Sequence, residues 1–591
     1  MMNAAPSEKE KSLMRRFLLG AVAFAILWVV VGAFALKLNR DEAQLLSVAW
    51  HMAQGERLYL DIWDNHGPLP MVAASLWFRA VAWESYAILY VFRGFGLAML
   101  LAGAWLLWRL ARRILPAPEW TAPLTVLFYL ASVITGEMGF QIRSDTPLTL
   151  IWIASLLLYF RARDKARWPH WLLAGAVIGL GFTCSVKTLI LGFTVGLMFV
   201  AETIWHRRLM WKELLLYGAG AAISTGLLLL ALRLFGVWDI FFETVFGQNF
   251  DREAEPPSYG WDQYRGYDSV GSIVLLLALA YTWVQAARRR VPLLVLLLSL
   301  PMAFLIFQFV VLLPTKYPQS LTTMIPPAAL VCAWVAWDLA TRIPRASWKP
   351  FQRLSPARWA MGALTVFALA IPFRVDYFED DRLATQVQWG QRLLANTPPD
   401  TTVFDADGHP FFRVHPGPFK CIVNTIRDRV EGGQFDTTFP QIIDEHDIQY
   451  AVIGSRFAKV KKETLRFLEA NYLPAKGPAP LFAAGKVIGE PGEFPLLIAG
   501  EYHWGLFDDA ANPITTATLT LNGQQPPNPT VLGDGTHSAS FPEWARLVIY
   551  RTPPENWGNW HRALTREMPH DNKRKLKKYH EKVWQEDILY Y

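Results

Sequence analysis

The sequence predicts an α-helical membrane protein that crosses the bilayer many times and carries a water-exposed α/β domain at its C-terminal end. Of its 591 residues, 52% are hydrophobic and only 18% are charged, against roughly 25% charged in an average soluble chain. The apolar residues gather in long uncharged runs as far as Arg374, after which charged residues, proline and glycine become frequent. These two observations argue against a water-soluble monomer.

The apolar runs define the predicted spans. A helix needs about 20 mostly apolar residues to cross a bilayer, or somewhat fewer where neighbouring helices thin the membrane. About eleven segments meet this requirement, namely residues 17–36, 86–108, 120–136, 146–160, 171–184, 188–205, 214–235, 270–286, 291–313, 321–339 and 359–373. The apolar stretch 68–83 contains Arg79, and we expect it to be a juxtamembrane or re-entrant segment at the outer face.

The loop charges orient these spans. With residues 68–83 kept outside the membrane, most lysines and arginines fall in loops on one side, and the positive-inside rule makes that side cytoplasmic. We therefore expect a cytoplasmic N-terminus over residues 1–16, a transmembrane domain over 17–375 and an extracytoplasmic α/β domain over 376–591. In a bacterium, such a chain lies in the inner membrane, and its first apolar run is a retained span.

Several function classes lack their sequence signals. The net charge of +7 comes mostly from basic residues in short loops, which orient a membrane protein, so no nucleic-acid partner is expected. The cysteines, Cys184, Cys332 and Cys421, show neither a disulfide framework nor the spacing of metal ligands. No glycine-rich nucleotide-binding motif follows a predicted strand.

The first outer loop, residues 37–67, holds the first candidate site. Asp41 and Glu42 follow the first span directly, and the apolar periodicity after them predicts a helix lying along the membrane. Adjacent helical residues do not share a face, so one of the two carboxylates would point into a given cavity. There it could deprotonate an acceptor hydroxyl, or it could simply cap the helix.

The same loop ends in YLDIWDNHGPLP, which brings Asp61, Asp64 and His66 together in sequence. Carboxylates and histidine can bind a divalent ion, but this spacing is no recognised ligand motif and the following Gly67-Pro68 favours a turn. We therefore assign no metal here and keep the three residues as candidates for substrate binding.

Basic residues at the outer ends of other spans complete the candidate site. Arg143 could hold a phosphate or sugar oxygen, while Asp145 could either position an acceptor or cap the following helix. Lys187 and Lys316, the latter beside Tyr317, could bind the phosphate of a lipid carrier. The alternative for each lysine is an ammonium that snorkels to the membrane interface.

Four segments in this order resemble one family. NRDEAQLLSVAWHMAQGERLYLDIWDNHGPLP, MGFQIRSDTPLTL, GFTCSVKTLILGF and PTKYPQSLTTMIPPAAL, within residues 17–339, are similar to the GT-C membrane glycosyltransferases of the protein mannosyltransferase and aminoarabinose transferase type. The resemblance implies transfer of a sugar from a polyprenyl-phosphate carrier to a hydroxyl of a protein, lipid or glycan, at the outer face and usually with inversion. It implies neither metal nor cofactor.

The resemblance also implies roles for single residues. Asp41 matches the first acidic position and would be the catalytic base, with Glu42 as its supporting partner. Asp145 matches the second acidic site, with Arg143 beside it. The residues near the carrier phosphate would be Lys187, Lys316 and Tyr317.

One position departs from the family pattern. Aminoarabinose transferases commonly carry a lysine before the proline of the first-loop motif, where this chain has His66 and Gly67 before Pro68. A phosphate contact from His66 would depend on pH, which leaves the donor's headgroup open.

The C-terminal part and one rival function complete the expectations. TTVFDADGHPFF and QYAVIGSRF predict two paired strands of a parallel type, and KKETLRFLEANY predicts a helix.

The rival function is a polytopic transporter or lipid flippase, which would place ionisable residues and broken helices near the bilayer midplane. Here most charges lie at the outer ends of the predicted spans, and no internal repeat is evident.

Overall fold

The computed structural model describes residues 8–81, 83–165, 167–247, 256–313, 317–342, 370, 377, 383–405, 408–415, 430, 438–446, 448–452, 462–474, 481–496, 500–508, 512–543 and 545–551. These residues form two compact units. Unit 1 comprises residues 1–36, 65–70 and 89–382, and unit 2 comprises residues 37–64, 71–88 and 383–591. Most of the predicted first outer loop, and most of the segment 68–83 that follows it, thus belong to the same unit as the C-terminal part.

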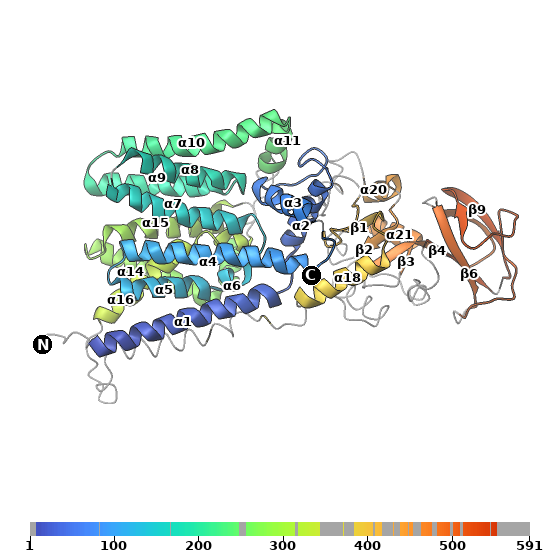
Figure 1. Cartoon of the computed structure of the whole chain (residues 1–591), viewed down its shortest axis with the longest axis horizontal. Helices are drawn as coiled ribbons and strands as arrows, with labels where there is room; N and C mark the ends of the chain where they lie inside the picture. The colour runs from blue at the N-terminus through green and yellow to red at the C-terminus, as the bar shows by residue number, and fades with distance from the viewer. Residues whose placement is uncertain are drawn as a thin grey trace. The chain divides into compact units, whose positions relative to one another are not determined.

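Unit 1 is a bundle of long apolar helices (Figure 1). Six helices of the described chain are long and apolar enough to cross a membrane. They are α1 (Glu8–Ala35), α4 (Ile88–Ile114), α9 (Thr188–His206), α10 (Trp211–Leu234), α14 (Ser269–Ala287) and α15 (Leu293–Phe307), the last extended by the π-helical turn η3 (Gln308–Leu312). Each coincides with one of the predicted spans.

Four further helices of the bundle coincide with predicted spans but are shorter or more polar. They are α5 (Pro118–Ala131), α7 (Asp145–Lys165), α8 (Trp168–Leu180) and α16 (Ile325–Arg342). Short helices α6 (Val133–Met138), α11 (Trp238–Phe241) and α13 (Pro257–Tyr267), with the turns η1 (Gly181–Thr183), η2 (Phe242–Gly247) and η4 (Pro318–Leu321), connect them. The predicted span 359–373 lies outside the described residues except at position 370, so the number of eleven spans stays a prediction.

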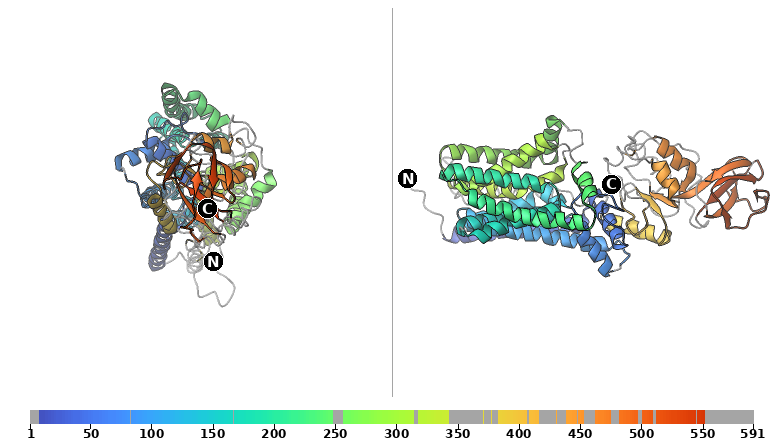
Figure 2. Two further views of the ribbon diagram at one scale, coloured as in Figure 1. Left: turned by 90° about the vertical axis from the view of Figure 1, so that its right-hand side faces the viewer. Right: turned by 90° about the horizontal axis from the view of Figure 1, so that it is seen from above.

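Helices α8 and α10, labelled in Figure 1 and seen from two other directions in Figure 2, lie side by side and approach through glycines. A Cβ atom on Gly175 would lie 1.8 Å from the carbonyl oxygen of Tyr217, and one on Gly220 would lie 2.0 Å from that of Leu172. Small residues allow such close backbone contact, which drives helix association within a bilayer. These glycines therefore set the spacing of the helix pair.

We expect Gly175→Ala to destabilise the protein, because the added methyl group forces two backbones apart and overpacking typically costs about 1–3 kcal/mol. Gly226→Ala on α10 is the matched control, since a Cβ there meets nothing within 4 Å and alanine is the better helix former. Thermal unfolding of the purified protein in detergent should show a lower Tm for Gly175→Ala alone. Equal midpoints for both variants would contradict the close packing.

Two helices of the first outer-loop region belong mainly to unit 2. α2 (Arg40–Ala53) confirms the helix predicted after the first span. Its N-cap, Asn39, accepts a hydrogen bond from the backbone N–H of Asp41 at 3.0 Å. α3 (Leu69–Val81) has 13 residues, fewer than a spanning helix needs, so the segment containing Arg79 is helical but too short to cross.

The C-terminal part combines helices with two sheets. Helices α18 (Leu383–Asn396), α20 (Phe439–Glu445) and α21 (Lys462–Asn471) accompany the strands β1 (Val403–Asp405), β2 (Tyr450–Val452), β3 (Tyr472–Pro474), β4 (Leu481–Ile488), β5 (Gly492–Leu496), β6 (Gly500–Phe507), β7 (Thr520–Leu521), β8 (Thr530–Leu532), β9 (Gly535–Ser540) and β10 (Arg546–Tyr550). One sheet has the order β1-β2-β4-β10-β6-β8, with β3 on β4, and the other has the order β5-β9-β7. β1 and β2 pair in parallel, with Phe404 opposite Ala451, which confirms the predicted parallel pair, and α21 confirms the predicted helix.

Candidate functional site

An ion pair of unit 1 joins two of the predicted site residues. Lys187 Nζ lies 2.7 Å from Asp145 Oδ1, with 26% and 10% of the two side chains exposed. Asp145 is the first residue of α7 and Lys187 immediately precedes α9. Since the N-terminal end of a helix favours a negative charge, α7 supports the carboxylate. The pair is accessible enough for Lys187 to meet an anion.

The turn that carries Lys187 packs against the end of the first-loop motif. The Gly67 N–H donates to the Cys184 carbonyl at 3.1 Å, and a Cβ at position 67 would lie 2.4 Å from the Thr183 carbonyl oxygen. Only glycine fits this approach, which explains the residue between His66 and Pro68. His66, which is half-buried, is thereby placed next to the turn that carries Lys187.

Arg143 lies in a second polar group of unit 1. It is 6% exposed, and its Nη1 donates to Gln141 Oε1 at 3.2 Å. Gln141 in turn donates to the backbone carbonyl of Glu137 at 2.7 Å, and the Tyr267 hydroxyl donates to the Glu137 carboxylate. Burial first, and then the Glu137 carboxylate, raise the pKa of Tyr267, whereas the nearby Arg143 lowers it.

Glu137 and Tyr267 were not predicted as site residues. Glu137 lies in the same segment, EMGFQIRSD, as Arg143. This proximity in sequence is the one signal that could have marked Glu137 as a site residue. Tyr267 ends α13, 130 residues away in sequence, so its hydrogen bond to Glu137 could not be read from spacing. Their contact joins α6 to the end of α13.

The segment that holds Lys316 and Tyr317 is only partly described. Tyr317 is 41% exposed and precedes η4, which contacts α6 and α13 of the same unit. Lys316 lies outside the described residues. Its phosphate-binding role stays a prediction.

The first-loop acidic residues belong to unit 2 and differ from one another in environment. Glu42 is fully buried, and its carboxylate accepts the N–H of Asn39 at 3.0 Å as half of a capping box. Asp41 is half-buried. The two neighbours therefore face differently, as expected, and the structure assigns helix capping to Glu42 and Asn39.

Asp61 and Asp64 have different partners. Asp61 forms an ion pair with Arg57 at 2.9 Å on the surface, an i,i+4 arrangement that needs no substrate. Asp64 is 1% exposed and accepts a hydrogen bond from Gln44 Nε2 of α2 at 2.8 Å. Burial and then the Asp64 carboxylate raise the pKa of Tyr59. Within the described parts of the chain, no group of three potential metal ligands occurs.

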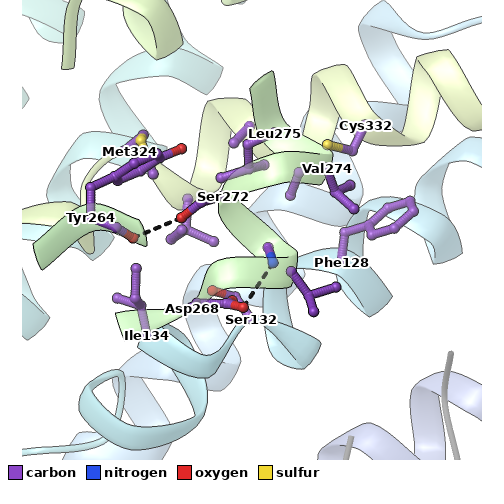
Figure 3. Close-up of a pocket in the computed structure, with 15 residues that line it drawn as sticks. Phe128, Ser132, Ile134, Tyr264, Asp268, Ser272, Val274, Leu275, Met324 and Cys332 are labelled. Atoms are coloured by element: carbon purple, nitrogen blue, oxygen red, sulfur yellow. Dashed lines mark hydrogen bonds between the residues drawn. The ribbon is translucent and has the colours of Figure 1, made fainter. Parts of the chain in front are cut away.

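An apolar pocket lies among α5, α13, α14 and α16 of unit 1 (Figure 3). Two hydrogen bonds join residues of its wall: the Ser272 hydroxyl donates to the Tyr264 carbonyl at 2.7 Å, and Asp268 accepts the N–H of Gly271 at 2.8 Å. Its volume of about 60 Å³ is well below the roughly 300 Å³ at which pockets for drug-sized ligands begin. This pocket by itself is too small for a lipid-linked sugar.

One segment of the chain matches a known family model. Residues 66–234, less than half of the chain, match the family model described as dolichyl-phosphate-mannose-protein mannosyltransferase. No curated protein matches the sequence.

Among solved structures, ArnT from Cupriavidus metallidurans has a similar fold. Its apo crystal structure is 14% identical, with 79% of this chain and 97% of that chain covered and a TM-score of 0.55. Its structure bound to undecaprenyl phosphate is 14% identical, with 67% and 83% covered and a TM-score of 0.52. These matches confirm the predicted GT-C-like helical fold of a multi-pass membrane protein and the resemblance drawn from the sequence.

Proposed function

We propose that the chain transfers a sugar from a polyprenyl-phosphate carrier to a hydroxyl acceptor at the outer face of a bacterial inner membrane. The observation that carries this proposal is the partly exposed Lys187–Asp145 pair at 2.7 Å, in a fold shared with ArnT, which binds undecaprenyl phosphate. The family match includes Arg143, Asp145 and Lys187. In this proposal the C-terminal part of the chain, which belongs to unit 2, is extracytoplasmic.

The donor phosphate is held by cations in this scheme. A phosphate diester that leaves as a monoester carries growing negative charge, which positive side chains stabilise in the transition state. Lys187 turns from Asp145 to the phosphate as the donor binds, and Arg143 adds a planar guanidinium suited to phosphate oxygens. Asp145, released from the lysine, accepts a hydrogen bond from a hydroxyl of the sugar or of the acceptor.

The acceptor is activated by a carboxylate of the first loop. Asp41 removes the proton of the acceptor hydroxyl as its oxygen bonds to the anomeric carbon. The bond from that carbon to the phosphate oxygen breaks, and polyprenyl phosphate leaves with the electron pair. Attack opposite the leaving group inverts the anomeric configuration. Glu42 supports Asp41 by capping the helix that carries it.

The remaining predicted residues take secondary roles. His66 lies beside the Lys187 turn and contacts the donor headgroup, and Lys316 with Tyr317 adds to the phosphate site. Asp64, buried against Gln44, fixes the first loop. Asp61 is held by Arg57 and contacts the donor headgroup only if this surface pair opens.

The rival function is a transporter or flippase for the same lipid. A transporter would place ionisable residues within its long apolar helices. In the described chain the predicted site residues lie instead at helix ends and in loops, so this arrangement favours the transferase. A flippase would move the intact donor, whereas a transferase cleaves it.

The proposal is tested with the purified full-length protein in detergent and a panel of radiolabelled polyprenyl-phosphate sugars, in the presence of an envelope extract as acceptor source. We expect label from at least one donor to pass into a product that no longer partitions with the lipid. A heat-inactivated sample is the control for chemical hydrolysis. Intact donor throughout the panel would count against transfer and would favour the transporter.

A further inference from the structure

Helix α2, which carries Asp41, is tied to the C-terminal part of unit 2 at both of its ends. Just before the helix, the Leu38 N–H donates to the side-chain carbonyl of Gln386 in α18, a residue that is 2% exposed. In the last turn, His51 Nε2 accepts the backbone N–H of His415 at 3.1 Å. These partners lie more than 300 residues away in sequence.

The two hydrogen bonds of His51 fix its chemical form. Its Nδ1 lies 2.8 Å from the carbonyl oxygen of Ser47, which can only accept, and its Nε2 faces an N–H that can only donate. The imidazole is therefore neutral, with its proton on Nδ1. His51 is 1% exposed and His415 is 4% exposed, so water does not compete for either bond.

Aromatic packing surrounds this connection. Trp50 meets Phe412 edge to face with ring centroids 6.3 Å apart, and Phe78 of α3 meets the same ring at 6.0 Å. The Tyr86 hydroxyl donates to the His409 carbonyl at 2.6 Å. Residues 409–415 thus share one core with α2 and α3.

Directional bonds at both ends of a helix also fix its rotation. Neighbouring residues of an α-helix point about 100° apart, and Asp41 is followed by a second carboxylate, Glu42. A rotation of that size would exchange the two groups. The ten buried residues of α2 already oppose a rotation that large, and the directional bonds of Gln386 and His51 set the finer angle at which Asp41 projects.

We propose that His51 is a positioning residue for the transfer reaction, which with Gln386 sets the rotation of α2 so that Asp41 meets the acceptor. This inference rests on the proposed function, in which Asp41 is the base. It makes α18 and residues 409–415 part of the transferase machinery rather than an appended domain.

The test compares His51→Leu, which removes both polar contacts, with His51→Gln, whose amide offers a donor and an acceptor. We expect His51→Leu to lower kcat by about 10–100-fold, since a misplacement of about 1 Å can cost a hundredfold, while the donor KM changes less than about twofold. His51→Gln should recover most of that loss. His446→Leu, at the exposed C-cap histidine after α20, should match the wild type.

Two further variants separate the possible failures. If His51 acts through Asp41, His51→Leu should have little further effect in an Asp41→Asn background, because coupled residues are non-additive. Gln386→Leu should reproduce the kcat loss, which keeps the test decisive if His51→Leu does not fold. Wild-type kcat in folded Gln386→Leu and His51→Leu would overturn the inference, as would additive losses. Full activity of Asp41→Asn would instead overturn the proposed base.

Discussion

Asp41→Asn is expected to lower the rate of sugar transfer by about 10²–10⁴-fold, the contribution typical of a positioned general base. The amide keeps the shape of the side chain but cannot take the acceptor proton. Because Asp41 is half-buried and the helix cap is made by Asn39 and Glu42, the fold should survive. Initial rates at saturating donor, with expression and Tm measured in parallel, check this expectation.

The neighbouring Glu42→Gln variant is the matched control for Asp41→Asn. It removes the adjacent charge, but its amide oxygen can still accept the Asn39 N–H that Glu42 accepts at 3.0 Å. We expect a loss of less than about tenfold, because Glu42 acts through the helix and not on the substrate. A larger loss in Glu42→Gln than in Asp41→Asn would reassign the base to Glu42.

Lys187→Met is expected to lower kcat/KM for the donor by about 10²–10³-fold, the loss typical when one group that stabilises transition-state charge is removed. Methionine preserves most of the apolar stem, so the change is chiefly the loss of the ammonium. It also leaves the Asp145 carboxylate, 10% exposed, without the partner at 2.7 Å. We therefore expect a lower Tm together with the kinetic loss.

The double variant Lys187→Met/Asp145→Asn separates binding from stability. Replacing both charges removes the cost of an unpaired, nearly buried carboxylate, so the Tm should return towards the wild type. Transfer should stay low, because the phosphate still lacks its cation. Recovery of both Tm and transfer in the double variant would show that the pair is a structural salt bridge only.

The helices and the paired strands could be predicted from sequence because their signals are local. Apolar runs of span length mark α1, α10 and α15, and the apolar period after Asp41 marks α2. The strands β1 and β2 are short and buried along their length, as expected of neighbours in a parallel sheet. In each case the pattern lies within a few turns of the chain.

The contacts of the site could not be predicted in the same way, because they join distant residues. Lys187 and Asp145 were assigned to the site separately, but their ion pair spans 42 residues. Asp61 and Asp64 look equivalent in sequence, yet Arg57 holds one at the surface while Gln44 binds the other in the interior. Glu42 illustrates a competing local role, since a capping box accounts for its carboxylate without reference to a substrate.

Membership of the two units is a further feature that sequence order conceals. The predicted boundary near residue 375 follows a change in composition along the chain. In the structure, residues 37–64 of the first outer loop and residues 71–88 after it join residues 383–591 in one unit. The hydrogen bonds that connect them use the backbone N–H groups of Leu38 and His415. Every residue except proline has such a group, so the sequence does not reveal these contacts.

The central claim is that the chain cleaves a polyprenyl-phosphate sugar and passes the sugar to a hydroxyl. The most direct measurement is the stoichiometry of a single turnover with a donor labelled differently in its sugar and its lipid. The account predicts one polyprenyl phosphate released for each glycosylated product, with neither formed by Asp41→Asn above the chemical background. Donor that crosses the membrane of reconstituted vesicles with both labels still joined, and without product, would contradict it.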